Sequence, residues 1–215
     1  MNKQKRSQYG EEESQEFSVQ FIPDKSGTYV IEIDDAIESP KQFSTAVQIL
    51  GMAKEDDSIE VRITNCPGGN VGATDGFLHA MRKCPAHVHM IACGGVHSMG
   101  TQILLEADSF ELGNGFHALI HCGQDGAYGN VNEYRAKSKF DEDFGVRKFK
   151  EAYEGFLSNK EMDDMLEGKD IWLDAQQWCE RAEKRSHYFK AKYEKMMKDQ
   201  NKKPRAKKAQ AAPEA

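Results

Sequence analysis

The sequence predicts an α/β domain built from repeated strand–helix crossover units. Short runs of β-branched and apolar residues alternate with segments in which apolar residues recur at helical spacing. Glycine-rich segments follow two of these runs, at 65–72 and 93–100. The chain of 215 residues is long enough for one such domain with a sizeable core, flanked by two polar ends.

The first unit combines a strand and a helix. Thr28–Ile33 has the composition of a strand, with Val30 and Ile31 facing the core. Ser39 and Pro40 are typical of an N-cap and of the first position of a helix. The apolar stripe of this helix is expected to contain Phe43, Ala46, Val47 and Leu50.

Two further units follow. Residues 59–63 alternate as a strand and lead into a helix. The inner face of that helix is predicted to hold Val71, Thr74, Leu78 and Met81. Pro85 ends it, and His87–Cys93 is the next strand. Gly94–Gly100 is predicted as a tight turn that opens a short helix through Glu106. The last short strands are expected at Ser109–Leu112 and Ala118–Ile120.

The remainder of the chain is predicted to be helical. One long helix is expected from Asn132 to Glu167, and a last helix behind Asp174 as N-cap. The apolar stripe of the long helix contains Phe149, Ala152, Tyr153, Phe156 and Leu157. The expected organisation is a mobile N-terminal arm at 1–20, a globular domain at 21–185 and a basic helical or disordered tail at 186–215.

Composition and charge argue against several classes of protein. No apolar run is long enough to cross a bilayer, and the N-terminus has no secretory signal. The five cysteines form no CxxC pair, so neither a disulfide framework nor a metal site is expected. These features predict a cytoplasmic protein with reduced thiols. The net charge is −6 although the tail is basic, and a solvated tail is favoured over one that binds nucleic acid.

Both glycine-rich segments are predicted to join a strand to a helix, at the edge where α/β sheets place their sites. They read NCPGGNVG at 65–72 and CGGVHSMG at 93–100. Glycine permits close approach of the backbone, and a helix start offers N–H groups that bind phosphate or stabilise an oxyanion. Neither segment has the GxxxxGK[ST] or GxGxxG pattern, which argues against a phosphate loop.

The second segment places Ser98 at the turn into a helix, a position that exposes a nucleophilic hydroxyl, although Val96 replaces the first glycine of GxSxG. A serine nucleophile needs a base. Among seven histidines, His121 follows an apolar strand and can reach a neighbouring strand end, whereas His97 is expected to point away from Ser98. Spacing alone does not choose a carboxylate among 35 acidic residues.

Four segments resemble motifs of the Clp protease proteolytic subunit, a family of serine peptidases. Residues 63–71 (ITNCPGGNV) resemble its glycine-rich signature, and 98–100 (SMG) its nucleophile motif. Residues 119–121 (LIH) are similar to its histidine motif, and 170–175 (DIWLDA) to the segment whose first aspartate completes the triad. The motifs occur in the family's order and with its spacing, over about residues 28–182.

The resemblance implies the roles of individual residues. Ser98 would attack the scissile carbonyl, His121 would take its proton, and Asp170 would hold His121 in the correct tautomer. The oxyanion hole would consist of the backbone N–H groups of Gly69 and Met99, supported by Pro67 and Gly68.

The resemblance also implies a fold and an assembly. The fold would be that of Clp protease and the crotonases, repeated β-β-α units with a long handle helix after residues 123–129. Handles of stacked hexameric or heptameric rings would meet through Phe140, Phe144 and Phe149, although core packing is favoured for Phe149. The substrates would be proteins or peptides, without a cofactor, and ATP would act only through a partner AAA+ unfoldase. Neither a membrane nor nucleic acid is an expected partner.

Departures from the family pattern leave alternatives open. His97, Cys122–Gly123 and Glu180–Ala182 differ from it, which indicates a divergent member, and a bacteriophage protein that matures capsids in the host cytoplasm is one hypothesis. A crotonase-like enzyme acting on acyl-CoA would share the architecture and the oxyanion hole without needing the triad. A scaffold that keeps the ring but has lost turnover is the other alternative, motivated by His97 and by the altered flank of Asp170.

Overall fold

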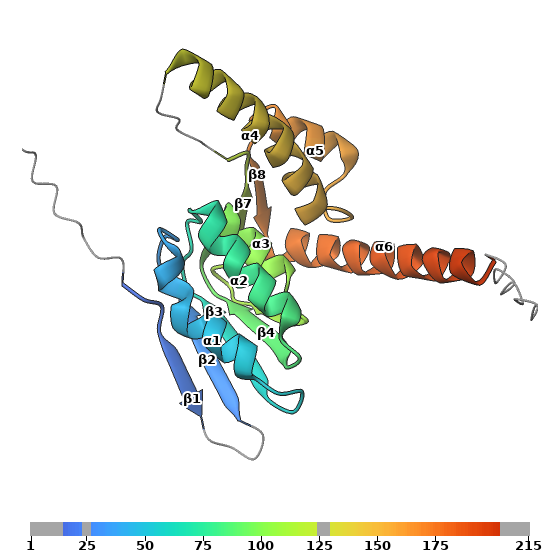
Figure 1. The fold of residues 1–215 in the computed structure, drawn as a ribbon. Coiled ribbons are helices and arrows are strands. Elements are labelled where there is room, and N and C mark those ends of the chain that lie inside the picture. Colours follow the sequence, from blue (N-terminus) through green and yellow to red (C-terminus); the bar gives the residue numbers. More distant parts are fainter. Residues whose placement is uncertain (1–14, 23–26, 124–129, 203–215) are drawn as a thin grey trace, which may run out of the picture.

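Two sheets and their covering helices make up the part of the chain that the computed structural model describes, residues 15–22, 27–123 and 130–202 (Figure 1). The main sheet has the strand order β1-β2-β3-β4-β6 and the smaller sheet the order β5-β7-β8. The predicted α/β class is confirmed. The main-sheet strands are β1 (Val19–Ile22), β2 (Thr28–Ile33), β3 (Ser58–Ile63), β4 (His87–Ala92) and β6 (Ser109–Leu112).

Each parallel strand of the main sheet continues, after a short break, toward the smaller sheet. β4 leads to β5 (Gly95–His97) and β6 leads to β7 (His117–Ile120), while β2 and β3 lead to the bridging residues Ile37 and Cys66. β8 (Ile171–Asp174) pairs antiparallel with β7 at the far edge. A helix follows each of these segments along the chain, which gives the repeated β-β-α unit that was predicted.

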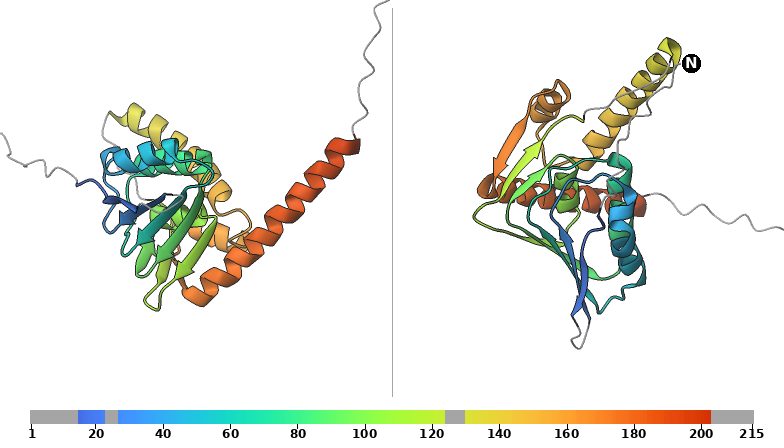
Figure 2. Two further views of the ribbon diagram at one scale, coloured as in Figure 1. Left: turned by 90° about the horizontal axis from the view of Figure 1, so that it is seen from below. Right: turned by 90° about the vertical axis from the view of Figure 1, so that its left-hand side faces the viewer.

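The helices lie around these sheets. Helices α1 and α2 lie side by side over one face of the main sheet, and α6 extends away from the body (Figures 1 and 2). The helical elements are the 3-10 helix η1 (Pro40–Phe43), α1 (Ser44–Met52), α2 (Val71–Lys83), α3 (Met99–Leu105), α4 (Val131–Ala152), α5 (Asn159–Leu166) and α6 (Ala175–Lys202). Among them, no helix of the described residues is long and apolar enough to cross a membrane.

Polar caps determine where the helices begin. Asn70 Oδ1 accepts a hydrogen bond from the N–H of Ala73 (2.9 Å) at the start of α2. At the start of α6, Asp174 Oδ1 accepts from the N–H of Gln177 (2.8 Å), and Gln177 Oε1 accepts from the N–H of Asp174 (3.1 Å). These bonds satisfy N–H groups that have no partner within a helix. Asp174 is therefore confirmed as an N-cap.

Several details differ from the sequence-based prediction. Val47 and Val71 are 37% and 41% exposed, because each lies at the rim of its helix contact while its neighbours on the stripe are buried. The long helix is interrupted by a turn between α4 and α5 in which Gly155 adopts a φ of 74°. Tyr153, Phe156 and Leu157 are buried as predicted, but in this turn. The segment 94–100, predicted as a turn, contains β5, and neither β1 nor β8 was predicted as a strand.

The expected domain boundaries fall within ordered elements. Phe17 is buried and β1 begins at Val19, so the end of the expected arm packs with the domain, while residues 1–14 lie outside the described residues. At the other end α6 passes position 186 without a break and runs to Lys202. Residues 124–129, expected to lead into the handle helix, and residues 203–215, the end of the expected tail, also lie outside the described residues.

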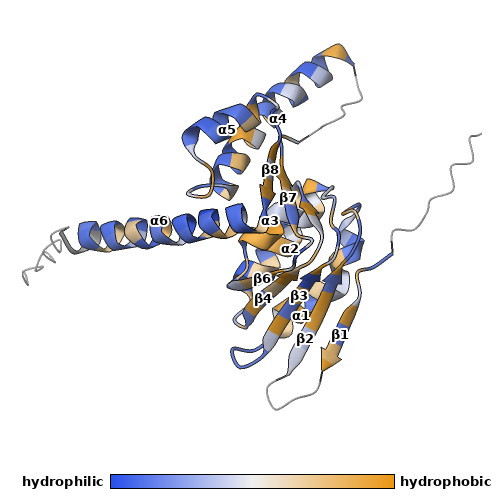
Figure 3. Cartoon of the chain, turned by 180° about the vertical axis from the view of Figure 1, so that it is seen from behind, coloured by the Kyte–Doolittle hydropathy of each residue, from blue (hydrophilic) through white to orange (hydrophobic). Residues whose placement is uncertain are grey.

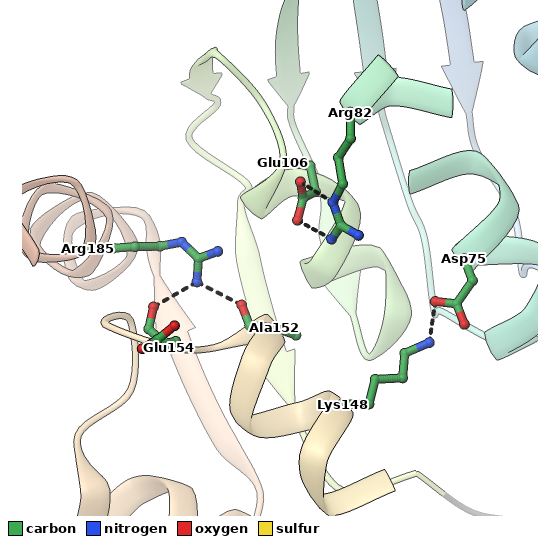
Figure 4. Close-up of polar contacts among 7 residues, drawn as sticks. All are labelled: Asp75, Arg82, Glu106, Lys148, Ala152, Glu154 and Arg185. Atoms are coloured by element: carbon green, nitrogen blue, oxygen red, sulfur yellow. Dashed lines mark hydrogen bonds and ion pairs between the residues drawn. The ribbon is translucent and has the colours of Figure 1, made fainter. Parts of the chain in front are cut away.

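Polar contacts tie α4 and α6 to the body (Figure 4). Lys148 of α4 forms an ion pair with Asp75 of α2. Arg185 of α6 donates from Nη1 to the carbonyl oxygens of Ala152 (2.7 Å) and Glu154 (3.0 Å). Burial lowers the pKa of Arg185, and these carbonyl groups at the end of α4 compensate the buried guanidinium. The start of α6 is thus joined to the end of α4.

A second clamp joins α5 to α6. Arg181 donates from Nη1 to Glu161 Oε2 (2.9 Å) and from Nη2 to Glu161 Oε1 (2.7 Å). The hydrogen bonds from Arg181 lower the pKa of Glu161 from 4.5 to about 2. A carboxyl group with a lowered folded-state pKa stabilises the fold above its ordinary value, and this stabilisation is lost as the pH falls from about 4.5 to about 2. Solvent screening keeps the contribution modest.

We expect Glu161→Gln to flatten the acid side of the stability profile. The urea midpoint of the unmodified chain should fall between about pH 4.5 and pH 2, and that of the variant should fall less over the same interval. Glu183→Gln removes an exposed carboxylate of α6 and should follow the unmodified chain. Equal slopes for Glu161→Gln and the unmodified chain would contradict the clamp.

Candidate active site

Ser98 lies between β5 and α3 in a strained conformation. Its φ of 53° and ψ of −123° make it the one non-glycine residue with positive φ in the described part of the chain. The Ser98 N–H donates to the carbonyl oxygen of Leu119 on β7 (2.8 Å), and the Ser98 carbonyl accepts from the N–H (3.0 Å) and hydroxyl (2.6 Å) of Thr101. The backbone is therefore held on both sides, while the hydroxyl does not cap α3.

The first glycine-rich loop passes directly beside this turn. A Cβ added to Gly68 would lie 2.5 Å from Ser98 Cβ, 2.7 Å from the carbonyl oxygen of His97 and 3.0 Å from the backbone nitrogen of Met99. Gly68 also has a φ of 90°, which side chains rarely adopt. Only glycine fits here, and Pro67 beside it is exposed.

Two backbone N–H groups near Ser98 are without an acceptor among the described residues. Met99 is the first residue of α3, so its N–H has no partner within the helix. Gly69 lies between two bonds to the neighbouring chain segment, Ile37 N–H to the Gly68 carbonyl (2.8 Å) and Asn70 N–H to the Ile37 carbonyl (2.6 Å). Parallel pairing turns the Gly69 N–H away from Ile37, to the side on which β5 lies.

The three residues of the predicted triad lie at one edge of the smaller sheet. Ser98 follows the last residue of β5, and His121 follows the last residue of β7, which runs parallel to β5. Asp170 precedes the first residue of β8, which runs antiparallel to β7 with Ile120 opposite Ile171. One further step of this register leads from His121 to Asp170. Strand order and direction thus bring three distant segments together.

The described residues do not join this set by hydrogen bonds. Ser98 and His121 are half-buried and Asp170 is exposed, and no hydrogen bond links any two of them in the part of the chain that is described. Hydrogen bonds of catalytic groups are often long before substrate binds. The catalytic roles of Ser98, His121 and Asp170, and of the N–H groups of Gly69 and Met99, therefore stay predictions.

His97, His117 and Trp172 form an aromatic cluster on the smaller sheet. This cluster was not predicted from the sequence. The ring of His97 lies 5.1 Å from that of His117 and 5.5 Å from that of Trp172, measured between centroids. Burial, and then the charges of His117 and His121, lower the pKa of His97. His97 therefore stays neutral at pH 7 and adds no positive charge beside His121. The cluster could not be predicted because Trp172 lies on β8, and β8 was not recognised as a strand.

Cys66 can be dismissed as an alternative nucleophile. It is fully buried, and this burial raises the pKa of its thiol to about 11. A thiol with so high a pKa stays protonated at neutral pH, and the thiolate is the reactive form. In the described residues no group of three or more histidine, cysteine or acidic side chains is arranged to hold a metal ion.

Comparison with known proteins gives one consistent result. The family model of Clp protease matches residues 20–144, which include Gly68, Ser98 and His121 but end before Asp170. The ATP-dependent Clp protease proteolytic subunit of Deinococcus radiodurans is 30% identical over 114 residues, which are 51% of this chain and 55% of that protein. The chain thus spans about half the length of this relative. With a model that matches more than half of its residues, this chain belongs to the Clp protease family.

Proposed function

We propose that this chain is a serine endopeptidase, the proteolytic subunit of a compartmentalised protease of the Clp type. The observation that carries the proposal is the turn at Ser98, near two backbone N–H groups that have no acceptor among the described residues. Acyl transfer needs a nucleophile and oxyanion donors in this relation to one another. Family membership makes peptide bonds the natural substrate of such a site.

In the proposed reaction, Ser98 Oγ attacks the carbonyl carbon of the scissile peptide bond while His121 accepts the hydroxyl proton. Asp170 orients His121 and stabilises its imidazolium form. The N–H groups of Gly69 and Met99 donate to the oxyanion of the tetrahedral intermediate. His121 then protonates the leaving amine, and water hydrolyses the acyl-enzyme by the reverse sequence of proton transfers. No cofactor takes part in these steps.

The exposed aromatic residues of α4 support an assembly of stacked rings. Phe140 and Phe144 are 60% and 43% exposed, and their rings stack at 5.6 Å. Phe149 instead packs against Tyr153 and the core, as favoured from the sequence. We propose that the Phe140–Phe144 pair contacts the same helix of a facing ring. Enclosure in such a particle would protect folded proteins in the cytoplasm from cleavage.

The name of the Deinococcus relative includes ATP dependence. By extension we propose that an AAA+ unfoldase supplies substrate to this chain, which itself binds no ATP. Maturation of phage capsid proteins in a host cytoplasm stays a hypothesis about the natural substrate. Neither proposal changes the chemistry assigned to Ser98.

We expect Ser98→Ala to abolish labelling by a fluorophosphonate probe and to lower peptide cleavage by at least about 10⁴-fold, because the nucleophile is removed. Ser109→Ala is the matched control. Ser109 Oγ lies 2.8 Å from both His87 Nε2 and His89 Nδ1, so Ser109 is a second serine beside imidazole groups. It belongs to β6 of the main sheet and lies far from the glycine-rich loop. This control should be labelled and should cleave peptide like the unmodified chain.

The opposite result, labelling lost only in Ser109→Ala, would contradict the assignment of Ser98. Turnover of an acyl-CoA thioester that survives Ser98→Ala would instead support the crotonase-like alternative. An assembled ring that binds no probe at all would support the scaffold.

We expect Gly68→Ala to lower peptide cleavage by at least about 10²-fold, since the added Cβ must displace Ser98 or the N–H of Met99. Gly76→Ala, in helix α2 with nothing within 4 Å of the added Cβ, is the control and should leave kcat/KM unchanged. Circular dichroism checks that both variants fold. A folded Gly68→Ala variant with unchanged kcat/KM would show that the loop does not support the site.

A further inference from the structure

The last helix continues well beyond the body of the domain (Figures 1 and 2). α6 has 28 residues, about 42 Å at the usual rise. Its first turns are anchored by Trp178, which is fully buried with its ring 4.8 Å from that of Phe156 and 5.6 Å from that of Phe116. The last polar contacts with the body, for the described residues of α6, are those of Tyr188 and Lys192 with Glu154.

The apolar face by which α6 is anchored continues beyond the last contact with the body. Trp178, Ala182 and Arg185 follow one another at the four- and three-residue spacing of a single helix face, and all three are at least partly buried. The same spacing continues into the exposed half of the helix. There it holds four large apolar residues, which we call the α6 stripe: Phe189 (37% exposed), Tyr193 (59%), Met196 (46%) and Met197 (38%).

The α6 stripe is unusual for its surroundings. Figure 3 shows α6 as a mainly hydrophilic helix interrupted by more apolar positions. A helix in solvent has no need for four large apolar side chains on one face, whereas contiguous exposed apolar residues are typical of an interaction surface. The stripe faces solvent because the body of its own chain does not reach that far.

Charge identifies the kind of surface that fits. Lys190 lies beside the stripe, and residues 189–199 contain four lysines against two carboxylates. Of these lysines, Lys192 is already paired with Glu154 of its own chain. The whole chain carries a net charge of −6, so the remainder is more acidic still. Pairing of two α6 helices would bring like charges together. Nucleic acid would neutralise the lysines but would leave the four apolar side chains uncovered.

We propose that the α6 stripe docks on the acidic body of a second copy of this chain. The apolar side chains would be removed from water, and Lys190 beside them would meet a carboxylate of that body. Because a helix of one copy contacts the body of the next, the contact is of the head-to-tail kind, which repeats and closes into a ring when the rotation permits. This surface goes beyond the proposed peptidase activity, and the contact does not depend on the reactivity of Ser98.

The test compares two double variants by native mass over a dilution series. Tyr193→Gln with Met196→Gln alters the stripe, and Ala191→Gln with Lys195→Gln alters the opposite face of the same helix. Glutamine preserves the helix, which circular dichroism verifies. We expect the assembly of the stripe variant to dissociate at a concentration at least about tenfold higher than that of the unmodified chain. The control variant should dissociate at the same concentration as the unmodified chain. An unchanged profile for the stripe variant overturns the proposal.

A cross-link identifies the partner. Tyr193 is replaced by photoreactive p-benzoylphenylalanine in a nuclease-treated mixture of ¹⁵N-labelled and unlabelled chains. Cross-links between labelled and unlabelled chains that end on residues 15–174 support the proposal. Cross-links confined to α6 itself, none between chains, or an assembly that nuclease dissolves, overturn it. If serine-probe labelling of the same sample fails while these cross-links form, the proposed activity fails and the interface stands.

Discussion

A serine at positive φ between a strand and a helix needs contacts on several sides to keep it there. Ser98 has them from β7, through the carbonyl of Leu119, from Thr101 in α3, and from the glycine-rich loop, where Gly68 leaves no room for a side chain. The short breaks between the main sheet and the smaller sheet place these three segments around one turn. The packing of the domain thus maintains the strained conformation of Ser98.

The smaller sheet brings separate sequence motifs close to one another. β5 and β7 are parallel, so Ser98 and His121 leave the sheet at the same edge, and the antiparallel β8 begins at that edge with Asp170. Clp protease family membership rests on residues 20–144 and therefore covers the segments of Ser98 and His121. Asp170 lies beyond that match, and its position next to His121 follows from the pairing of β7 with β8 alone.

The region that follows the matched residues has its own organisation. The turn after α4 buries Tyr153 and Phe156, and α6 is anchored beside it through Trp178, Arg181 and Arg185. Because these contacts fix the first half of α6, the second half can extend beyond the body and still keep its direction. The residues that pack into the core and the residues of the exposed α6 stripe therefore lie on one face of the same helix.

The sequence by itself determined β2, β3 and β4 and the helix starts at Ser39 and Asp174, because periodicity and capping act over a few residues. Only the tertiary structure decided that Gly95–His97 and Ile171–Asp174 are strands, since three or four residues carry no detectable period and their partners are distant in the chain. Burial in a turn likewise separated Tyr153 and Phe156 from the helix that their spacing predicted. Asp170 shows the difference most clearly, because strand register, which no local pattern contains, brings it to the edge where His121 lies.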